Sequence, residues 1–257
     1  MILMKIQGGL GNQMFQWACG RSLSIERHCS LIIDTSSFIA DRKRSFRLPL
    51  FNKINQAIFT SEVFVLNTSI SGFTQITDDF KTFDFSRGEI HMNGYWQSEL
   101  FFKNIKKVIE EDFNLINYEY ILRKYPIIDR TISLHIRRGD YVTSNGYHPV
   151  QPLSYYEKAL DIIGDWNKLL VFSDDIEWCK NNLNFDKVQF VEEANEFETL
   201  YLMSHVQDNI IANSSFSWWG AWLNKNPQKR VIAPNLWFGE ISGICTDYIV
   251  PNTWIKI

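Results

Sequence analysis

Residues 2–34 of the chain read ILMKIQGGLGNQMFQWACGRSLSIERHCSLIID, and this stretch contains the start of an α/β fold. The apolar run Ile2–Ile6 predicts a short buried strand, which the glycine-rich turn Gly8–Asn12 follows. Apolar residues near helical spacing predict a helix over about 13–26, and Leu31–Ile33 predicts a second strand. A strand, a glycine turn, a helix and another strand in this order begin a doubly wound α/β unit.

The second half of the chain shows this alternation more cleanly. Pro126 restricts the backbone before it and predicts a domain boundary. Residues 40–90 are less regular. Outside them the pattern predicts strands at 90–96, 131–137, 168–173, 187–191, 209–212 and 230–233, and helices at 98–112, 118–124, 153–163, 175–183, 196–205 and 216–225. We expect two Rossmann-like domains, 1–126 and 127–257, with a cleft between them and ligands beyond the carboxyl ends of the strands.

The composition is that of an ordinary globular protein. Hydrophobic residues make up 45% and charged residues 21%, which excludes a disordered chain. The formal net charge is −3, so nothing general attracts nucleic acid or an anionic membrane, and any anion site must be built locally. The chain contains 9 Trp, and such rings accumulate in sugar-binding clefts, but a Trp-rich core explains most of them equally well.

Cysteine usage and the lack of long apolar runs predict an intracellular protein. The cysteines are Cys19, Cys29, Cys179 and Cys245. They form no Cys-x-x-Cys pair and have no metal-ligand spacing, which favours reduced, partly buried thiols. The first apolar run is too short for a signal peptide, and no run approaches the roughly 20 residues that span a bilayer. We therefore expect a cytoplasmic protein, with peripheral contact at the inner face of the cytoplasmic membrane left open.

The stretch His135–Tyr141 reads HIRRGDY and lies at the end of a predicted strand. Alternate side chains of a strand share a face, so His135 and Arg137 point the same way. A planar guanidinium holds phosphate oxygens bidentately, which makes Arg137 the candidate ligand for a diphosphate, with His135 beside it. Arg138 is expected to anchor the turn through Asp140 or another carboxylate. An ion-paired turn without a ligand is the alternative interpretation.

A second candidate lies where the predicted helix 216–225 begins. Unpaired N–H groups at a helix start attract an anion, and Ser214 and Ser215 precede that helix directly. Their hydroxyls can bond phosphate oxygens or cap the helix, and both interpretations stay open. Trp218 and Trp222 are four residues apart and are predicted to pack in the core.

The remaining polar signals are less specific. The turn Gly8–Gln13 matches neither Gly-x-Gly-x-x-Gly nor a P-loop, so a plain tight turn is as good an interpretation as phosphate binding. Asn12 and Gln13 offer amides for a donor or acceptor contact. Asp174 and Asp175 can accept hydrogen bonds from a base such as guanine, or can begin a helix favourably. The chain contains no Asp-x-Asp, the usual acidic pair of metal-dependent sugar-nucleotide enzymes.

Two predicted loops contain charged or titratable side chains to which the sequence assigns no single role. Asp41–Arg47 is the only concentrated basic stretch, and a solvated loop is the favoured interpretation. Contact with an acidic lipid surface or with a charged lipid-linked acceptor is the alternative. The loop 143–151, which contains His148, either covers the cleft, contacts an acceptor or is an ordinary surface loop.

These motifs, in this order, resemble the α-1,2-fucosyltransferases of glycosyltransferase family 11. The matching stretches are Gly8–Trp17, His135–Tyr141 with Pro152–Tyr156, Phe172–Cys179 and Leu200–Asn224, and they span nearly the whole chain. The resemblance implies a GT-B fold, in which two Rossmann-like domains face each other across a cleft. It implies that domain 127–257 binds GDP-L-fucose and that domain 1–126 lies on the acceptor side. Inversion at the anomeric carbon, with no metal or other cofactor, is also implied.

The resemblance and the chemistry of the residues together define the candidate site. Arg137 and Asn12 are expected to act in catalysis. Glu198 enters because relatives carry an acidic residue just before a Leu-x-Leu-Met-Ser stretch. The expected donor-binding residues are His135, Arg137, Gly11, Asn12, Gln13, Asp174, Glu198, Ser214, Ser215 and Phe216, and Arg138 and Asp140 are expected to support the motif.

The function implied is transfer of L-fucose from GDP-β-L-fucose to the 2-hydroxyl of a galactoside in a glycan or an O-antigen precursor. The expected partners are GDP-fucose and a galactose-terminated oligosaccharide or lipid-linked glycan, and no nucleic acid. Arg137 and the helix start would stabilise the charge that grows on the leaving diphosphate. The general base is not identified; Asp140 is a candidate, and a structural pairing with an arginine is the alternative. Another fucosyl linkage, or a non-catalytic sugar- or nucleotide-binding protein, also stays open.

Overall fold

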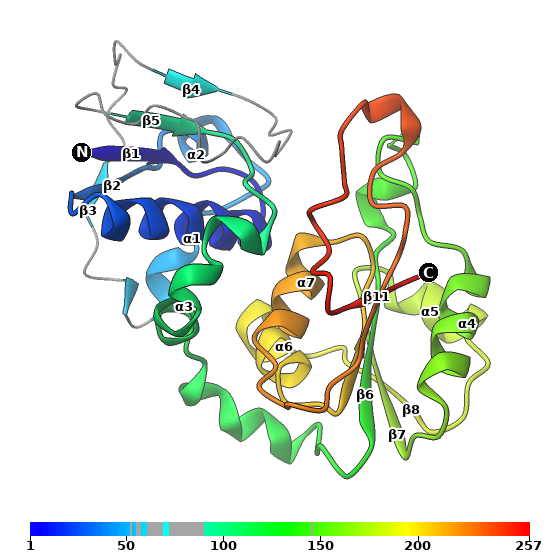
Figure 1. Cartoon of the computed structure of the whole chain (residues 1–257). Helices are drawn as coiled ribbons and strands as arrows, with labels where there is room; N and C mark the ends of the chain where they lie inside the picture. Colours follow the sequence, from blue (N-terminus) through cyan, green and yellow to red (C-terminus); the bar gives the residue numbers. More distant parts are fainter. Residues whose placement is uncertain (52, 55–57, 61–68, 72–89, 145) are drawn as a thin grey trace. The chain divides into compact units, whose positions relative to one another are not determined.

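The protein forms two compact units in its computed structural model, which describes residues 1–51, 53–54, 58–60, 69–71, 90–144 and 146–257 (Figure 1). The first unit consists of Met1–Asn114 with Asp247–Ile249, and the second of Leu115–Thr246 with Val250–Ile257. Much of the irregular stretch 40–90 lies outside the described residues. The expectation that the two units face each other across a cleft stays a prediction.

The first unit contains a parallel sheet with the strand order β3-β2-β1-β5-β4. Its strands are β1 (Ile2–Lys5), β2 (Leu31–Asp34), β3 (Ile58–Thr60), β4 (Ser69–Ser71) and β5 (Ile90–Asn93). Its helices are α1 (Leu10–Glu26), α2 (Ser37–Ala40) and α3 (Lys106–Asp112), with the 3₁₀ turns η1 (Leu48–Leu50), η4 (Glu99–Phe101) and η5 (Lys103–Ile105). The predicted order of strand, glycine turn, helix and strand over residues 2–34 is therefore confirmed, but α1 begins at Leu10, so Leu10–Asn12 belong to the helix and not to the turn.

Two elements of this unit differ from the prediction. The strand predicted at 90–96 ends at Asn93, and Trp96 has a positive φ of 52°, which an extended strand does not allow. The helix predicted at 98–112 is broken into η4, η5 and α3. Only its last part is α-helical, because Phe102 has a φ of −143° and interrupts the helical backbone.

The second unit contains a parallel sheet with the order β11-β10-β9-β6-β7-β8. Its strands are β6 (Thr131–Ile136), β7 (Lys168–Ser173), β8 (Val188–Phe190), β9 (Asp208–Ile210), β10 (Val231–Ala233) and β11 (Ile255–Lys256). Its α-helices are α4 (Leu153–Ile163), α5 (Ile176–Asn182), α6 (Glu196–Met203) and α7 (Ser215–Trp222), and its 3₁₀ turns are η6 (Ile116–Arg123), η7 (Gly139–Tyr141) and η8 (Glu240–Ser242). Every strand and helix predicted after Pro126 is present, with small shifts of the ends. Strand β11 and the 3₁₀ turns η7 and η8 were not predicted.

The second sheet is covered on both faces, with α4 and α5 on one side and α6 and α7 on the other (Figure 1). All six residues of β6 are buried, as expected for a central parallel strand. Trp218 and Trp222 of α7 are 0% and 4% exposed and stack with their ring centroids 6.1 Å apart, which confirms their predicted place in the core.

The two units divide between Asn114 and Leu115, before the boundary predicted at Pro126. The intervening segment packs on the second unit: Tyr118 of η6 stacks on Phe197 of α6 at 5.8 Å, and the hydroxyl of Tyr125 accepts the backbone N–H of Glu193 at 3.2 Å. Proline punctuates the local backbone, whereas a domain boundary follows side-chain packing, so the two need not coincide. No helix within the described ranges is long and apolar enough to cross a membrane.

Candidate functional site

The strand order of the second sheet reverses between β6 and β9. From β6 the chain proceeds to β7 and β8 on one side, and it continues with β9, β10 and β11 on the other. At such a switch point the neighbouring loops leave the carboxyl edge in opposite directions and open a crevice in which ligands bind. Arg137 follows β6 directly, and the segment Asn213–Phe216 follows β9. Two of the predicted motifs therefore flank the switch point.

Arg137 is held between two carboxylates. Its Nη2 donates to Oδ1 of Asp140 at 2.6 Å, and its Nη1 lies 2.9 Å from Oδ2 of Asp174. The guanidinium also lies over the ring of Tyr141, with Cζ 5.2 Å from the centroid. The side chain is 22% exposed, so the guanidinium is fixed but still accessible. This is the geometry of a preorganised anion ligand, and its contact with a diphosphate stays a prediction.

Arg138 anchors the turn through a carboxylate other than Asp140. Its Nε lies 3.1 Å from Oδ2 of Asp175, and its guanidinium stacks on Trp178 with Cζ 3.8 Å from the ring centroid. Its backbone N–H donates to Oδ1 of Asp174 at 2.9 Å. Asp140, the first partner considered for Arg138, pairs with Arg137 instead. Asp175 is the N-cap of α5 and accepts the N–H of Trp178 at 3.3 Å, so it has the structural role left open by the sequence.

Gly139 lies against the carboxylate of Asp174. A Cβ at this position would be 2.3 Å from Oδ2 of Asp174, closer than any atoms can approach. A side chain here would therefore displace the carboxylate that holds both Arg137 and the N–H of Arg138. Since Asp174 is engaged by the motif itself, its expected contact with the donor base stays a prediction.

His135 is buried beside this ion-pair cluster as a neutral imidazole. Burial, with a smaller contribution from the charge of Arg137, lowers the pKa of His135 to about 3. Its Nδ1 is buried without a hydrogen-bond partner among the described residues, and its ring lies 6.3 Å from that of Phe216. His135 thus contributes a neutral hydrogen-bonding group, and the positive charge of the motif belongs to the arginines.

The start of α7 is connected to the motif. Ser214 is the N-cap, but its side chain makes no capping hydrogen bond, which argues against capping as its role. Ser215 is the first helical residue, and Ser215 and Phe216 are both half-buried. The hydroxyl of Tyr141 donates to the carbonyl of Asn213 at 3.0 Å, which ties the loop after β6 to the loop after β9. The hydroxyl of Ser214 and the first N–H groups of α7 can therefore face an anion held by Arg137.

The loop 143–151 packs on the same motif. His148 stacks on Tyr141 with the ring centroids 4.6 Å apart, and its ring lies 5.1 Å from that of Phe238. The hydroxyl of Ser144 donates to the carbonyl of His148 at 2.8 Å. Burial is the main cause that lowers the pKa of His148, while Asp140 acts in the opposite direction. The described part of this loop is fastened down, and its role toward a cleft or acceptor stays a prediction.

Glu198 is occupied by contacts within the second unit. One carboxylate oxygen accepts the backbone N–H of Asn195 at 2.6 Å in a capping box at the start of α6, and the other accepts the hydroxyl of Tyr120. Glu198 is 8% exposed. These contacts explain the acidic residue as part of the helix start, and its expected contact with the donor stays a prediction.

The glycine turn of the first unit also lies at a switch point. The chain proceeds from β1 to β2 and β3 on one side, and β5 and β4 lie on the other. Gln13 is fully buried and donates to the carbonyls of Gly8 and Ser45, both at 2.9 Å, while its carbonyl accepts the N–H of Arg47 at 2.9 Å. Its amide is thus structural. Asn12 accepts a hydrogen bond from Gln97 at 2.8 Å and is only half-buried.

Gly11 is buried in the first turn of α1, directly beside Asn12. Roles for Gly11, Asn12 and Gln13 at the donor, and for Asn12 in catalysis, stay predictions.

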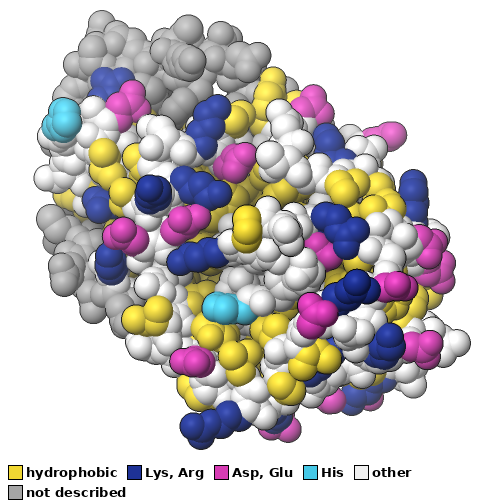
Figure 2. All heavy atoms as spheres, turned by 60° about the horizontal axis from the view of Figure 1, so that its bottom comes forward, with side chains coloured by type: hydrophobic (Ala, Val, Ile, Leu, Met, Phe, Trp, Pro, Cys, Tyr) yellow, Lys and Arg dark blue, Asp and Glu magenta, His cyan; other side chains and the backbone are white. Residues whose placement is uncertain are grey.

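The face drawn in Figure 2 carries mixed charge, and the described residues form no group of metal ligands. On the face drawn in Figure 2, basic and acidic side chains are interspersed. Within the described ranges, no three His, Cys, Asp or Glu side chains gather as metal ligands would. The expectation of a metal-independent enzyme stays a prediction.

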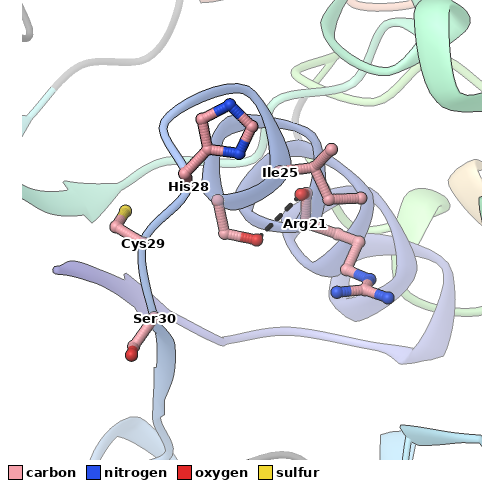
Figure 3. A pocket seen from close by; sticks show the side chains of 6 residues that line it. Arg21, Ile25, His28, Cys29 and Ser30 are labelled. Atoms are coloured by element: carbon pink, nitrogen blue, oxygen red, sulfur yellow. Dashed lines mark hydrogen bonds between the residues drawn. The ribbon is translucent and has the colours of Figure 1, made fainter.

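A surface hollow of about 500 Å³ lies away from these loops (Figure 3). It is lined by Arg21, Ser24, Ile25, His28, Cys29 and Ser30. These residues lie at the end of α1 and before β2, at the amino-terminal edge of the sheet. The glycine turn lies at the opposite, carboxyl-terminal edge, so the hollow is not part of the candidate site.

The fold is that of an α/β protein with an accessible arginine, Arg137, beside the switch point of its second sheet. The sequence matches Glycosyl transferase family 11 over residues 1–256, and the chain belongs to this family. It is therefore a glycosyltransferase.

Two relatives from Escherichia coli are each 32% identical to it. They are the α-1,2-colitosyltransferase, with 100% of this chain and 99% of the relative covered, and the O-antigen biosynthesis glycosyltransferase WbnK, with 98% and 99% covered.

The fold is similar to that of the NodZ α-1,6-fucosyltransferase in crystals soaked with GDP-fucose. The TM-score is 0.56 at 12% identity, with 91% of this chain and 94% of that chain covered. A second structure, of fucosyltransferase NodZ from Bradyrhizobium, gives a TM-score of 0.54 at 12% identity and covers 86% and 92%. At this identity the likeness concerns the fold alone.

Sequence reasoning missed several residues that hold the site. Gln16 is fully buried and connects the two loops of the first switch point, accepting the N–H of Gln7 at 3.0 Å and donating to the carbonyl of Gly94 at 2.9 Å. Asn213 donates to the carbonyl of Trp237 at 2.9 Å. Gln16 and Asn213 are polar residues at positions where the helical or strand pattern predicts burial. That mismatch was the signal in the sequence that could have identified them.

Proposed function

We propose that this glycosyltransferase transfers L-fucose from GDP-β-L-fucose to the 2-hydroxyl of a galactoside, with inversion and without a metal. The observation that carries the proposal is the fixed, accessible guanidinium of Arg137 at the switch point of the second sheet. Tyr141 ties its turn to the loop before α7, where the N-cap Ser214 makes no capping hydrogen bond. That arrangement suits a nucleoside diphosphate. The sugar is inferred from the family and from the similarity in fold to the NodZ α-1,6-fucosyltransferase, crystals of which were soaked with GDP-fucose.

The proposed chemistry is displacement of GDP by an acceptor hydroxyl. As the glycosidic bond to the diphosphate breaks, negative charge grows on the leaving phosphate oxygens. Arg137 and the first N–H groups of α7 face that charge as preorganised donors, and each such donor typically contributes about 3–4 kcal/mol. The acceptor is proposed to be a galactose-terminated glycan, including an O-antigen precursor, since the relative WbnK is an O-antigen biosynthesis glycosyltransferase.

A second candidate donor is GDP-colitose. One relative is an α-1,2-colitosyltransferase at 32% identity over the whole chain. Colitose differs from L-fucose by lacking the 3-hydroxyl. A site that hydrogen-bonds that hydroxyl rejects the deoxy sugar strongly, by about 10⁴-fold or more, whereas an apolar site discriminates by only about 100-fold. The ratio of kcat/KM for the two donors therefore identifies the sugar and the kind of pocket that receives it.

The decisive experiment supplies each donor with a panel of galactose-terminated acceptors in the presence of a chelator. GDP release is measured, and the linkage of the product is determined by NMR. A fucosyl-α-1,2-galactoside from GDP-fucose supports the proposal. Faster transfer of colitose assigns the second candidate. Binding of GDP without transfer from either donor would contradict both.

The role of Arg137 is tested by Arg137→Ala. We expect kcat to fall about a hundredfold or more while the protein still folds, because the charge on the leaving diphosphate loses a donor worth about 3–4 kcal/mol. Arg137→Lys, which keeps the charge but not the bidentate fork, should recover only part of the rate. Arg123→Ala on the exposed side of η6 is the matched control. Near-normal turnover of a folded Arg137→Ala variant would remove this residue from the mechanism.

A further inference from the structure

The proposed function assigns no role to the basic loop Asp41–Arg47 of the first unit. This loop connects α2 to η1, and the side chains of Arg42, Lys43, Arg44 and Arg47 are exposed. Its one acidic residue shapes the turn: Oδ1 of Asp41 accepts the N–H groups of Lys43 at 2.8 Å and Arg44 at 3.1 Å. In a chain with a net charge of −3, the loop thus concentrates four basic side chains against one acidic one.

Buried side chains of the first unit hold the backbone of this loop in place. The buried amide of Gln13 donates to the carbonyl of Ser45 and accepts the N–H of Arg47, both at 2.9 Å. Phe46 packs between Phe38 at 5.8 Å and Phe59 at 5.2 Å, measured between ring centroids. The exposed basic side chains are therefore attached to a backbone that the core fastens, and the guanidinium of Arg44 extends towards Gly9, where a Cβ would lie 3.8 Å from Nη1.

Exposed aliphatic side chains lie on both sides of the cations in the chain. Ile39 of α2 is 73% exposed and Leu50 of η1 is 52% exposed. Binding a small soluble anion does not require exposed aliphatic groups. Cations combined with aliphatic side chains are instead typical of a surface that contacts the interface of an anionic bilayer, where the cations attract lipid phosphates and the aliphatic groups insert among the acyl chains.

We propose that the surface from Ile39 to Leu50 docks the protein on an anionic lipid bilayer. The cations bind the headgroup phosphates, and Ile39 and Leu50 enter the boundary between headgroups and acyl chains. The proposed docking does not depend on the identity of the donor or the acceptor, because it follows from the charge, the exposure and the fastening of this loop. The proposed contact is peripheral, because it involves only the headgroups and the boundary with the acyl chains.

The test is co-sedimentation of the full chain with vesicles of phosphatidylcholine, with and without phosphatidylglycerol. We expect binding to the anionic vesicles only, and release of the protein as the salt approaches 1 M, where the screening length falls to about 3 Å. One basic residue near an anionic surface is worth about fivefold in partition, so Arg42→Gln with Lys43→Gln should weaken binding by about 25-fold. Adding Ile39→Ser to this double variant should weaken binding to the same vesicles further.

The matched control is Lys103→Gln with Lys107→Gln, which removes two exposed lysines of the same unit at a different place and should leave partition unchanged. Thermal unfolding checks that every variant is folded. Equal loss from the Arg42/Lys43 double variant and the Lys103/Lys107 double variant would show that only overall charge matters and would overturn the proposal. So would binding of inorganic pyrophosphate by the loop without any binding to the anionic vesicles, since that result assigns the cations to a soluble ligand.

Discussion

The two switch points of the molecule occupy the same place in their sheets but are fastened by different chemistry. At the first, between β1 and β5, neutral amides join the loops: Gln16 connects Gln7 to Gly94, and Gln97 bonds Asn12. At the second, between β6 and β9, charged groups fasten the turn after β6. These are Arg137 and Arg138 with Asp140, Asp174 and Asp175.

This difference suggests a structural role for the amides of the first switch point and a binding role for Arg137 at the second. Hydrogen bonds made by buried side-chain amides involve no net charge, so their strength hardly depends on pH or salt. They hold the backbone in one conformation. Partly exposed ion pairs are screened and can exchange partners, so Arg137 can give up the 60% exposed Asp140 for a phosphate. We therefore expect mutation of the buried amides at the first switch point to lower stability, and mutation of Arg137 or of the residues that orient it to lower turnover.

The largest effect is expected for Gly139→Ala. The added methyl group must displace Asp174, whose Oδ2 would lie 2.3 Å away, and Arg137 then loses its fixed orientation. We expect kcat/KM to fall about a hundredfold, which is about 2.7 kcal/mol of transition-state stabilisation. Glu157→Ala, at an exposed position of α4, is the control in steady-state kinetics. Equal loss in both variants would show that the contact with Asp174 does not matter.

The next effect is on stability and belongs to the first switch point. Gln13→Ala removes three hydrogen bonds and leaves the N–H of Arg47 and the carbonyls of Gly8 and Ser45 without that partner. We expect the free energy of unfolding in urea to fall by about 2 kcal/mol. Because the contacts are neutral, the loss should be the same in low and high salt. A strong salt dependence would contradict the distinction drawn between the two switch points.

The pH dependence of stability should come in part from the second switch point. Folded His135 stays neutral down to its pKa of about 3, whereas the unfolded chain takes up that proton near 6.5. Its contribution to stability is thus fully present above about pH 6.5 and is lost as the pH falls towards 3, by up to about 1.4 kcal/mol per pH unit. His135→Gln should remove this slope in urea unfolding, while His91 and His148, whose pKa values are also lowered, remain in both proteins.

The smallest effect is expected for Arg138→Lys. Lysine keeps the charge near Asp175 but cannot stack its plane on Trp178, which the guanidinium of Arg138 contacts at 3.8 Å. We expect a loss of about 1 kcal/mol in the free energy of unfolding, similar at low and high salt because arginine and lysine place the same charge near Asp175. A variant as stable as the parent protein would show that the stacking contributes nothing.

Local sequence patterns were sufficient for the order of the elements. Apolar runs and glycine turns predicted the strands and helices of residues 2–34 and of the chain after Pro126, because alternation of these patterns reflects which face of each element is buried. The same patterns placed His135–Asp140 and Ser214–Phe216 at the ends of strands. Parallel strands share a carboxyl edge, so the closeness of these two motifs followed once the sheet was assumed to be parallel.

Partners between distant residues were decided only by the tertiary structure. The sequence of the motif suggested Asp140 as a partner for Arg138, but strand β7 brings Asp174 and Asp175 to the arginines instead. Gln13 likewise reads as a ligand, and only the path of residues 45–47 shows that its amide is already bonded. Short-range patterns fix the direction of a side chain, whereas its partner depends on which strands pair, and that is a property of the whole sheet.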